Sequence, residues 1–256
     1  MLERLGAIDV SKGTMTAFGS QLLQMPLHPR FGAVVLEGRK LGCAHAAATA
    51  ATLLSDAEQL GRGASQRGAS FERGAERGAD LHEAVDAFLL AEQRSFPEGL
   101  CREFGSHPGA ARGLQQNRNR LLPRGVGNDE RSRDTTNLNR CLLRGFPDRV
   151  VRRAAPVSGN EVRTGTMVGG RGVTLPAAAD GEELILALRL HETGRQQRSQ
   201  AVLTAILTVP DLEAVAASSL TTVTDAQLDE SAGRVIAVRQ HRYLDLSLRS
   251  ARGGEV

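Results

Sequence analysis

The character of the sequence changes near residue 150, and this change limits the folds that the chain can adopt. Before it, apolar residues recur at helical spacing, most clearly in residues 80–92, where Leu81, Val85 and Phe88 share a face. After it, four runs rich in β-forming residues alternate with glycine-containing turns. These runs are residues 162–175, 184–190, 201–209 and 235–248. Four or five strands in about 100 residues suit a small sandwich or an OB-like barrel. We therefore predict an α+β chain with a domain boundary near 145–160.

The N-terminal segment, residues 5–30, predicts a strand, a turn and a helix in that order. Gly13 supports a tight turn, and Thr16 is placed to cap the helix that follows. We expect Pro26 and Pro29 to force an extended segment after this helix, because proline lacks the amide hydrogen that a helix needs.

Residues 31–145 predict a mainly helical region. Helices are expected within 31–55 (two), 80–92, 114–122 and 135–144. Asp80 is placed to cap the third of these. Between them, residues 61–80 repeat the letters RGA, and each recurring glycine costs a helix about 1 kcal/mol relative to alanine. We therefore predict a flexible Arg/Gly stretch at 61–80, with one short further helix near 210–217 in the β-rich part.

Positive charge is concentrated in one part of the chain. Residues 112–153 contain eleven arginines and four acidic residues, a local charge of +7 (11 − 4), whereas the whole chain carries +3. A segregated basic segment is typical of a polyanion partner, and also of a solvated helix face. Tryptophan is absent and tyrosine occurs once, which argues against an aromatic stacking platform for single strands. Phosphate contact by arginine remains open.

The spacing of the cysteines and the lack of long apolar runs argue against zinc-binding, disulfide-rich and membrane-spanning classes of protein. Cys43, Cys101 and Cys141 are far apart and form no C-x-x-C pair, so we predict small reduced core residues rather than a zinc site or a disulfide framework. No apolar signal segment and no run near the length of a membrane span is present. We expect a soluble cytoplasmic protein with no membrane contact.

Four stretches resemble the HrpB-type group of DEAH-box ATP-dependent helicases. They are LGAIDVSKGTMTAFGSQLLQMPLHPR at 5–30, LLRGFPDRVVRR at 142–153, VGGRGVTL at 168–175 and GRVIAVRQHRY at 233–243. Their order and spacing agree with that family over roughly residues 1–248. The resemblance implies a winged-helix tail at 1–30, a helical ratchet-like region at 31–145 and a small β-rich domain at 150–250.

The motor motifs of that family are missing. ATP hydrolysis there uses a G-x-x-x-x-G-K-[ST] loop, whose amides and lysine hold the phosphates, and an acidic motif that binds magnesium. This sequence contains neither, since Lys12 follows no glycine-rich approach and Asp129-Glu130 continues as Arg-Ser. We expect no catalytic residue, metal site or cofactor in this chain, and no ATPase or helicase activity from it alone. ATP and magnesium are implied only for the missing motor domains.

The resemblance implies an accessory role in ATP-driven unwinding or remodelling of RNA. In that family these domains line the exit side of the strand channel, so the expected partners are RNA or another nucleic acid and helicase motor domains in cis or in trans. Arg149, Arg152, Arg153 and Arg171 are the arginines that we expect to contact phosphate. For each of them the alternative is a structural salt bridge to a nearby carboxylate.

Two other functions remain open. One is a free-standing RNA- or ribosome-associated adaptor that kept the accessory domains. The other is an inert fragment of a truncated helicase gene. Residues 1–5 fit a helical pattern without a cap and the sequence ends in Arg-Gly-Gly-Glu-Val, which favours the fragment over the adaptor.

Overall fold

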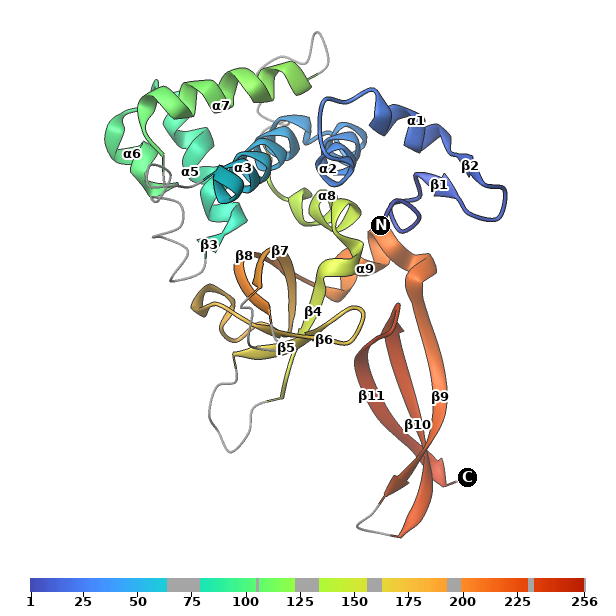
Figure 1. Cartoon of the computed structure of the whole chain (residues 1–256). Helices are drawn as coiled ribbons and strands as arrows, with labels where there is room; N and C mark the ends of the chain where they lie inside the picture. Colours follow the sequence, from blue (N-terminus) through green and yellow to red (C-terminus); the bar gives the residue numbers. More distant parts are fainter. Residues whose placement is uncertain are drawn as a thin grey trace.

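The computed structural model describes residues 1–63, 79–104, 106–122, 134–155, 163–192, 199–229 and 233–255. Helices gather in one part of the molecule, a small barrel lies beside them, and a three-stranded sheet projects away from both (Figure 1). The α+β fold class is therefore confirmed. The helical part ends with α8 at Gly145, and the first barrel strand begins at Val150.

The N-terminal segment folds as a strand–turn–helix unit. Strands β1 (Ile8–Asp9) and β2 (Thr14–Met15) form a hairpin, with Gly13 at a φ of +62° in its turn. Helix α1 (Ala17–Leu23) follows, and the Thr16 hydroxyl accepts a hydrogen bond of 3.0 Å from the Gly19 amide, which confirms the predicted cap.

The expectation for Pro29 was wrong. Helix α2 (Pro29–Lys40) begins at this proline, with His28 as its cap. Proline is well tolerated at the first helical position, because that residue's amide has no partner within the helix in any case. Residues 2–5 form turns rather than the helix that their pattern predicted.

Five further helices complete the helical part as far as the structure describes it. They are α3 (Ala44–Gly63), α5 (Leu81–Gln93), α6 (Glu98–Glu103), α7 (Pro108–Leu121) and α8 (Leu138–Gly145). Asp80 caps α5 as predicted, because its Oδ1 accepts a hydrogen bond from the His82 amide. Most of the predicted Arg/Gly stretch, residues 64–78, lies outside the described residues; α3 reaches Gly63, and β3 (Ala79–Asp80) follows the gap.

Two glycines allow α2 to lie close against its neighbours α3 and α8. A Cβ on Gly38 would collide with the Cβ of Ala47 in α3. A Cβ on Gly145 would lie 2.6 Å from the carbonyl oxygen of Arg30. The alanine-rich start of α3 supports the same close packing, because residues 46–48 are completely buried.

Five strands close into a barrel with the topology of an OB fold. They are β4 (Val150–Arg153), β5 (Thr164–Met167), β6 (Arg171–Thr174), β7 (Leu184–Glu192) and β8 (Ser199–Leu207). The pairing order is β8-β6-β5-β4-β7, and β7 pairs with β8 to complete the ring. The β6–β8 pair is parallel and the other barrel pairs are antiparallel. Of the two predicted architectures, the barrel is the one adopted.

The remaining strands form a separate antiparallel sheet. After helix α9 (Val209–Ala216), close to its predicted position, come β9 (Leu220–Asp229), β10 (Arg234–Tyr243) and β11 (Leu246–Glu255) in the order β11-β10-β9. The predicted run 235–248 is thus broken by a turn at Leu244, whose φ is +52°. Short 3₁₀ turns occur at Pro147–Arg149 (η2), Ala177–Ala179 (η3) and Ala217–Ser219 (η4).

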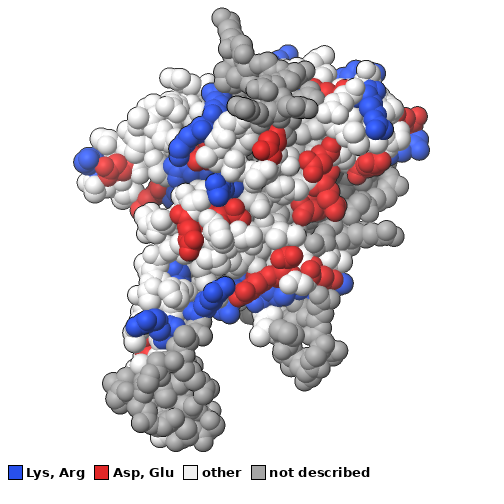
Figure 2. Space-filling view, turned by 180° about the vertical axis from the view of Figure 1, so that it is seen from behind, with Lys and Arg blue, Asp and Glu red and all other residues white. Residues whose placement is uncertain are grey.

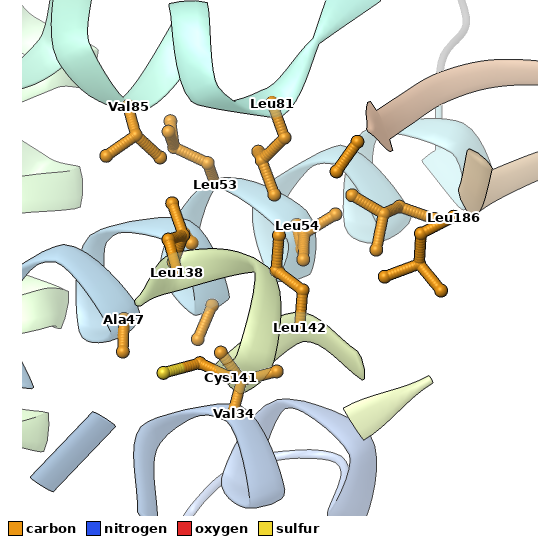
Figure 3. Close-up of a cluster of buried hydrophobic side chains, with 14 of the residues drawn as sticks. Val34, Ala47, Leu53, Leu54, Leu81, Val85, Leu138, Cys141, Leu142 and Leu186 are labelled. Carbon is orange, nitrogen blue, oxygen red and sulfur yellow. The ribbon is translucent and has the colours of Figure 1, made fainter. Parts of the chain in front are cut away.

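The helices and the barrel share one hydrophobic core. Figure 3 shows Leu186 of β7 facing the same cluster as Leu54 of α3, Leu81 of α5 and Leu142 of α8. Alternate residues of β7 point the other way, and Ile185 packs inside the barrel. Both faces of β7 are therefore buried, which explains why its sequence is a nearly continuous apolar run.

A buried ion pair joins α5 to α7. Arg118 (1% exposed) donates hydrogen bonds of 2.6 and 3.0 Å to the two carboxylate oxygens of Glu92 (6% exposed). Burial opposes ionisation of this carboxyl, but hydrogen bonds from Arg118 and Gln115 and the charge of Arg118 outweigh it and lower the pKa of Glu92.

We expect Glu92→Gln to lower the free energy of unfolding by about 3–5 kcal/mol, because it leaves the Arg118 charge buried without its partner. Urea denaturation measures this. The matched control is Glu98→Gln, which breaks the exposed Arg102–Glu98 pair and should cost no more than about 1 kcal/mol. Equal effects of the two substitutions on the free energy of unfolding would contradict the conclusion that the buried Arg118–Glu92 pair stabilises the fold.

Two cysteines that the sequence separates by 98 positions lie in contact. The Sγ atoms of Cys43, before α3, and Cys141, in α8, are 3.5 Å apart, and both residues are buried. The hydrogen bond with Cys141 lowers the pKa of Cys43.

We expect hydrogen peroxide to join Cys43 and Cys141, with the two thiol hydrogens lost and the peroxide reduced to two waters. Intact mass should fall by about 2 Da, and one free thiol, Cys101, should remain in the unfolded chain. Cys43→Ser should prevent the loss of mass. Three free thiols after oxidation of the unsubstituted chain would contradict this expectation.

Candidate nucleic-acid interface

The segment from Phe146 to Arg149 connects the helical part to the barrel and is held from the helical side. Asp148 accepts hydrogen bonds of 2.6 and 2.8 Å from the two terminal nitrogens of Arg30, the second residue of α2. Arg30 also donates to the Gly145 carbonyl, and its guanidinium lies 5.3 Å from the centre of the Phe146 ring. Burial raises the pKa of Asp148, but the hydrogen bonds and charge of Arg30 outweigh it, and the net shift is downward.

The same segment is held from the side of the three-stranded sheet. The hydroxyl of Tyr243, at the end of β10, donates a hydrogen bond of 3.0 Å to the Pro147 carbonyl. Burial raises the pKa of Tyr243 to about 12, so this donor stays protonated at neutral pH. Asp245, in the turn after β10, accepts a hydrogen bond of 2.9 Å from the Gly169 amide between β5 and β6. Three of the four stretches that carry the family resemblance therefore contact one another at this segment, and the fourth is bonded, through Gly169, to the turn that follows Tyr243.

Two of the arginines expected to contact phosphate, Arg149 and Arg171, lie at the end of the segment 146–149 and at the start of β6. Arg149 ends η2 and is half-buried, and Arg171 begins β6 and is exposed. Both make contacts within the protein. Neither is enclosed in the core.

Arg152 and Arg153 are adjacent in β4 and differ in their surroundings. Arg152 donates a hydrogen bond of 2.8 Å to the Ser247 carbonyl of β11, its Nε lies 3.6 Å from Glu183, and its side chain is 35% exposed. Arg153 is only 9% exposed; it donates to the carbonyls of Glu182 and Ala179 and lies 3.9 Å from Asp180. The geometry of Arg153 suits a structural role better than phosphate contact.

Within the part of residues 112–153 that the structure describes, some arginines are taken up in contacts inside the protein. Arg118 is buried against Glu92, and Arg140 lies 3.9 Å from Asp211. On the face shown in Figure 2, basic and acidic side chains both occur, scattered among uncharged ones. The positive charge in the described part of residues 112–153 therefore comes from several elements and is partly neutralised.

Sequence reasoning missed the pairing of Arg30 with Asp148. Both residues belong to stretches that carry the family resemblance, but they are 118 positions apart, and nothing in their spacing indicates contact. Among the described residues, no group of three His, Cys, Asp or Glu side chains could hold a metal ion. In the same part of the chain, no helix is both long and apolar enough to span a membrane.

We expect Asp148→Asn to destabilise the protein by about 2 kcal/mol at pH 7, because it removes the charge that Arg30 binds. The pKa of Asp148 is lower in the folded state than in the unfolded state. The contribution of the ionised carboxylate to the free energy of unfolding is therefore present above about pH 4 and is lost as the pH falls further. The difference between variant and unsubstituted protein should therefore shrink in acid. Asp9→Asn, at the exposed Lys12–Asp9 pair, is the control and should change little. A difference that does not depend on pH would exclude the charge as its cause.

Comparison with known proteins identifies this architecture. No family model and no curated protein matches the sequence. The structure matches that of the DExH-box NTPase HrpB from E. coli, with a TM-score of 0.64 and 16% identity over 100% of this chain. It also matches a structure of the Escherichia coli DEAH/RHA helicase HrpB, with a TM-score of 0.60 and 17% identity over 98% of this chain. In each case the chain spans 26% of the solved one. The chain thus has the fold of one portion of HrpB.

Proposed function

We propose that this chain is an accessory nucleic-acid-binding portion of an ATP-dependent RNA helicase resembling HrpB. The observation that supports it is the fold, which corresponds over the whole chain to one portion of that helicase. We retain the division into a winged-helix tail at 1–30, a ratchet-like region at 31–145 and a β-rich domain at 150–250 as part of the proposal. The partners would be RNA or another nucleic acid and helicase motor domains in cis or in trans. ATP and magnesium would bind to those motor domains.

The barrel supports a role in nucleic-acid binding. OB folds bind oligonucleotides on the face of their second and third strands, which here are β5 and β6. Arg171 begins β6 and is exposed. Arg149 immediately precedes β4, the strand next to β5, and the partly exposed Arg152 lies within β4. These three arginines are the better candidates for phosphate contact. Arg153 is the weakest, because it is more deeply buried than Arg152 and donates to two carbonyl groups rather than one.

We expect the purified chain to bind single-stranded RNA with an affinity that falls steeply with salt, and to show no ATPase activity in the same sample. Fluorescence anisotropy with a labelled RNA of about 20 nucleotides, longer than one OB-fold site, measures the affinity. Arg171→Ala should reduce the slope of log K against log salt by about 0.7, the value for one phosphate contact on a single strand.

Arg102→Ala is the matched control, because it removes one exposed arginine on α6, away from the barrel. It should leave the slope unchanged. A folded sample that binds no RNA at low salt would refute the proposal and favour the inert fragment. ATPase activity would refute the expectation that the motor lies elsewhere.

A further inference from the structure

A groove with both polar and apolar lining residues lies in the helical part, where α1, α2 and α7 end. It consists of two hollows of about 500 and about 210 Å³ that share Pro26, Arg120 and Leu121. The polar side chains that line it are mainly Gln21, Gln24, Arg39, Asn117 and Arg120, and none of its lining residues that the structure describes is a carboxylate. None of the four arginines expected to contact phosphate belongs to it.

Local structure fixes the walls of this groove. Helix α1 ends at Leu23, and Pro26 lies in the connection to α2 that forms one wall. Arg39, in the last turn of α2, donates a hydrogen bond of 2.7 Å to the Leu121 carbonyl at the end of α7. This bond holds the ends of α2 and α7 together while Arg39 stays exposed. Arg120 is also exposed, and among the described residues it makes no ion pair.

The electrostatics of the groove favour an anion. Three helices end there, and each helix C-terminus carries at most about half a negative charge. Arg39 and Arg120 carry one full positive charge each, so the groove remains positive. Two arginines with no carboxylate among the described lining residues lie beside three side-chain amides that are able to donate hydrogen bonds, and such a set of donors matches phosphate and ribose oxygens.

We propose that this groove binds the phosphate backbone of single-stranded RNA, as a second contact in addition to the arginines of the barrel. The inference rests on the proposed function, because it concerns how the same chain holds the same class of ligand. None of the described lining residues is aromatic, so these residues offer no platform for base stacking, and we expect a contact that does not depend on the base sequence.

The test compares two double variants of the full chain in the anisotropy assay. Arg39→Gln with Arg120→Gln should weaken RNA binding about 10- to 30-fold at 0.1 M salt and reduce the salt slope by about 1.4, which corresponds to two phosphate contacts. Arg102→Gln with Arg112→Gln removes the same charge from exposed positions on α6 and α7 outside the groove and should have little effect. An equal loss with single-stranded DNA of the same length would also support phosphate contact.

A third variant separates binding from stability. Arg39 supports the end of α7, whereas Arg120→Gln breaks no bond within the described structure and should still weaken binding about fivefold. If Arg120→Gln binds RNA with unchanged affinity, or if the two double variants bind equally well, the groove is not an RNA-binding site. The proposed function would still stand. No RNA binding by the folded unsubstituted chain would overturn both.

Discussion

The pairing of Arg30 with Asp148 fixes the relation between the helical part and the barrel. The chain passes between the two parts through the short segment 146–149, which includes the 3₁₀ turn η2. A bidentate arginine–carboxylate pair restricts both the distance and the orientation of its two residues. Here Arg30 lies in the first turn of α2, and Asp148 lies shortly before β4. Tyr243 adds a third element to the same segment, so helices, barrel and projecting sheet all depend on it.

Hydrophobic packing reinforces this arrangement. Strand β7 contributes alternate side chains to the barrel interior and to the helical core, so the two parts cannot separate without exposing Leu186 and its neighbours on α5 and α8 (Figure 3). Polar bonds at the linker set the orientation, and the shared core supplies most of the stabilisation. Gly38 and Gly145 allow both the polar bonds at the linker and the shared core to form, because larger residues would push α2 away from α3 and α8.

Local signals in the sequence predicted the elements well, whereas contacts between distant residues escaped them. Thr16 and Asp80 were recognised as caps because a cap depends on a few adjacent residues. Strand β9 was missed because its residues 221–226 are mostly polar and all exposed, so this part of the strand carries no buried face to produce alternation. The Cys43–Cys141 contact and the internal role of Arg153 depend on the tertiary fold, for which spacing in the sequence gives no signal.

Arginine serves two purposes in this protein, and its surroundings distinguish them. A guanidinium has five N–H donors, and where carbonyls or a buried carboxylate occupy them, as at Arg118 and Arg153, little remains for a ligand. Arg39, Arg120 and Arg171 are exposed, and they come from α2, α7 and β6 rather than from one segment. A bound strand that contacted all three would extend from the helical part onto the barrel. The rigid connection through Arg30 and Asp148 would then keep the two binding surfaces at a constant separation, which favours simultaneous binding because the second contact costs little additional entropy.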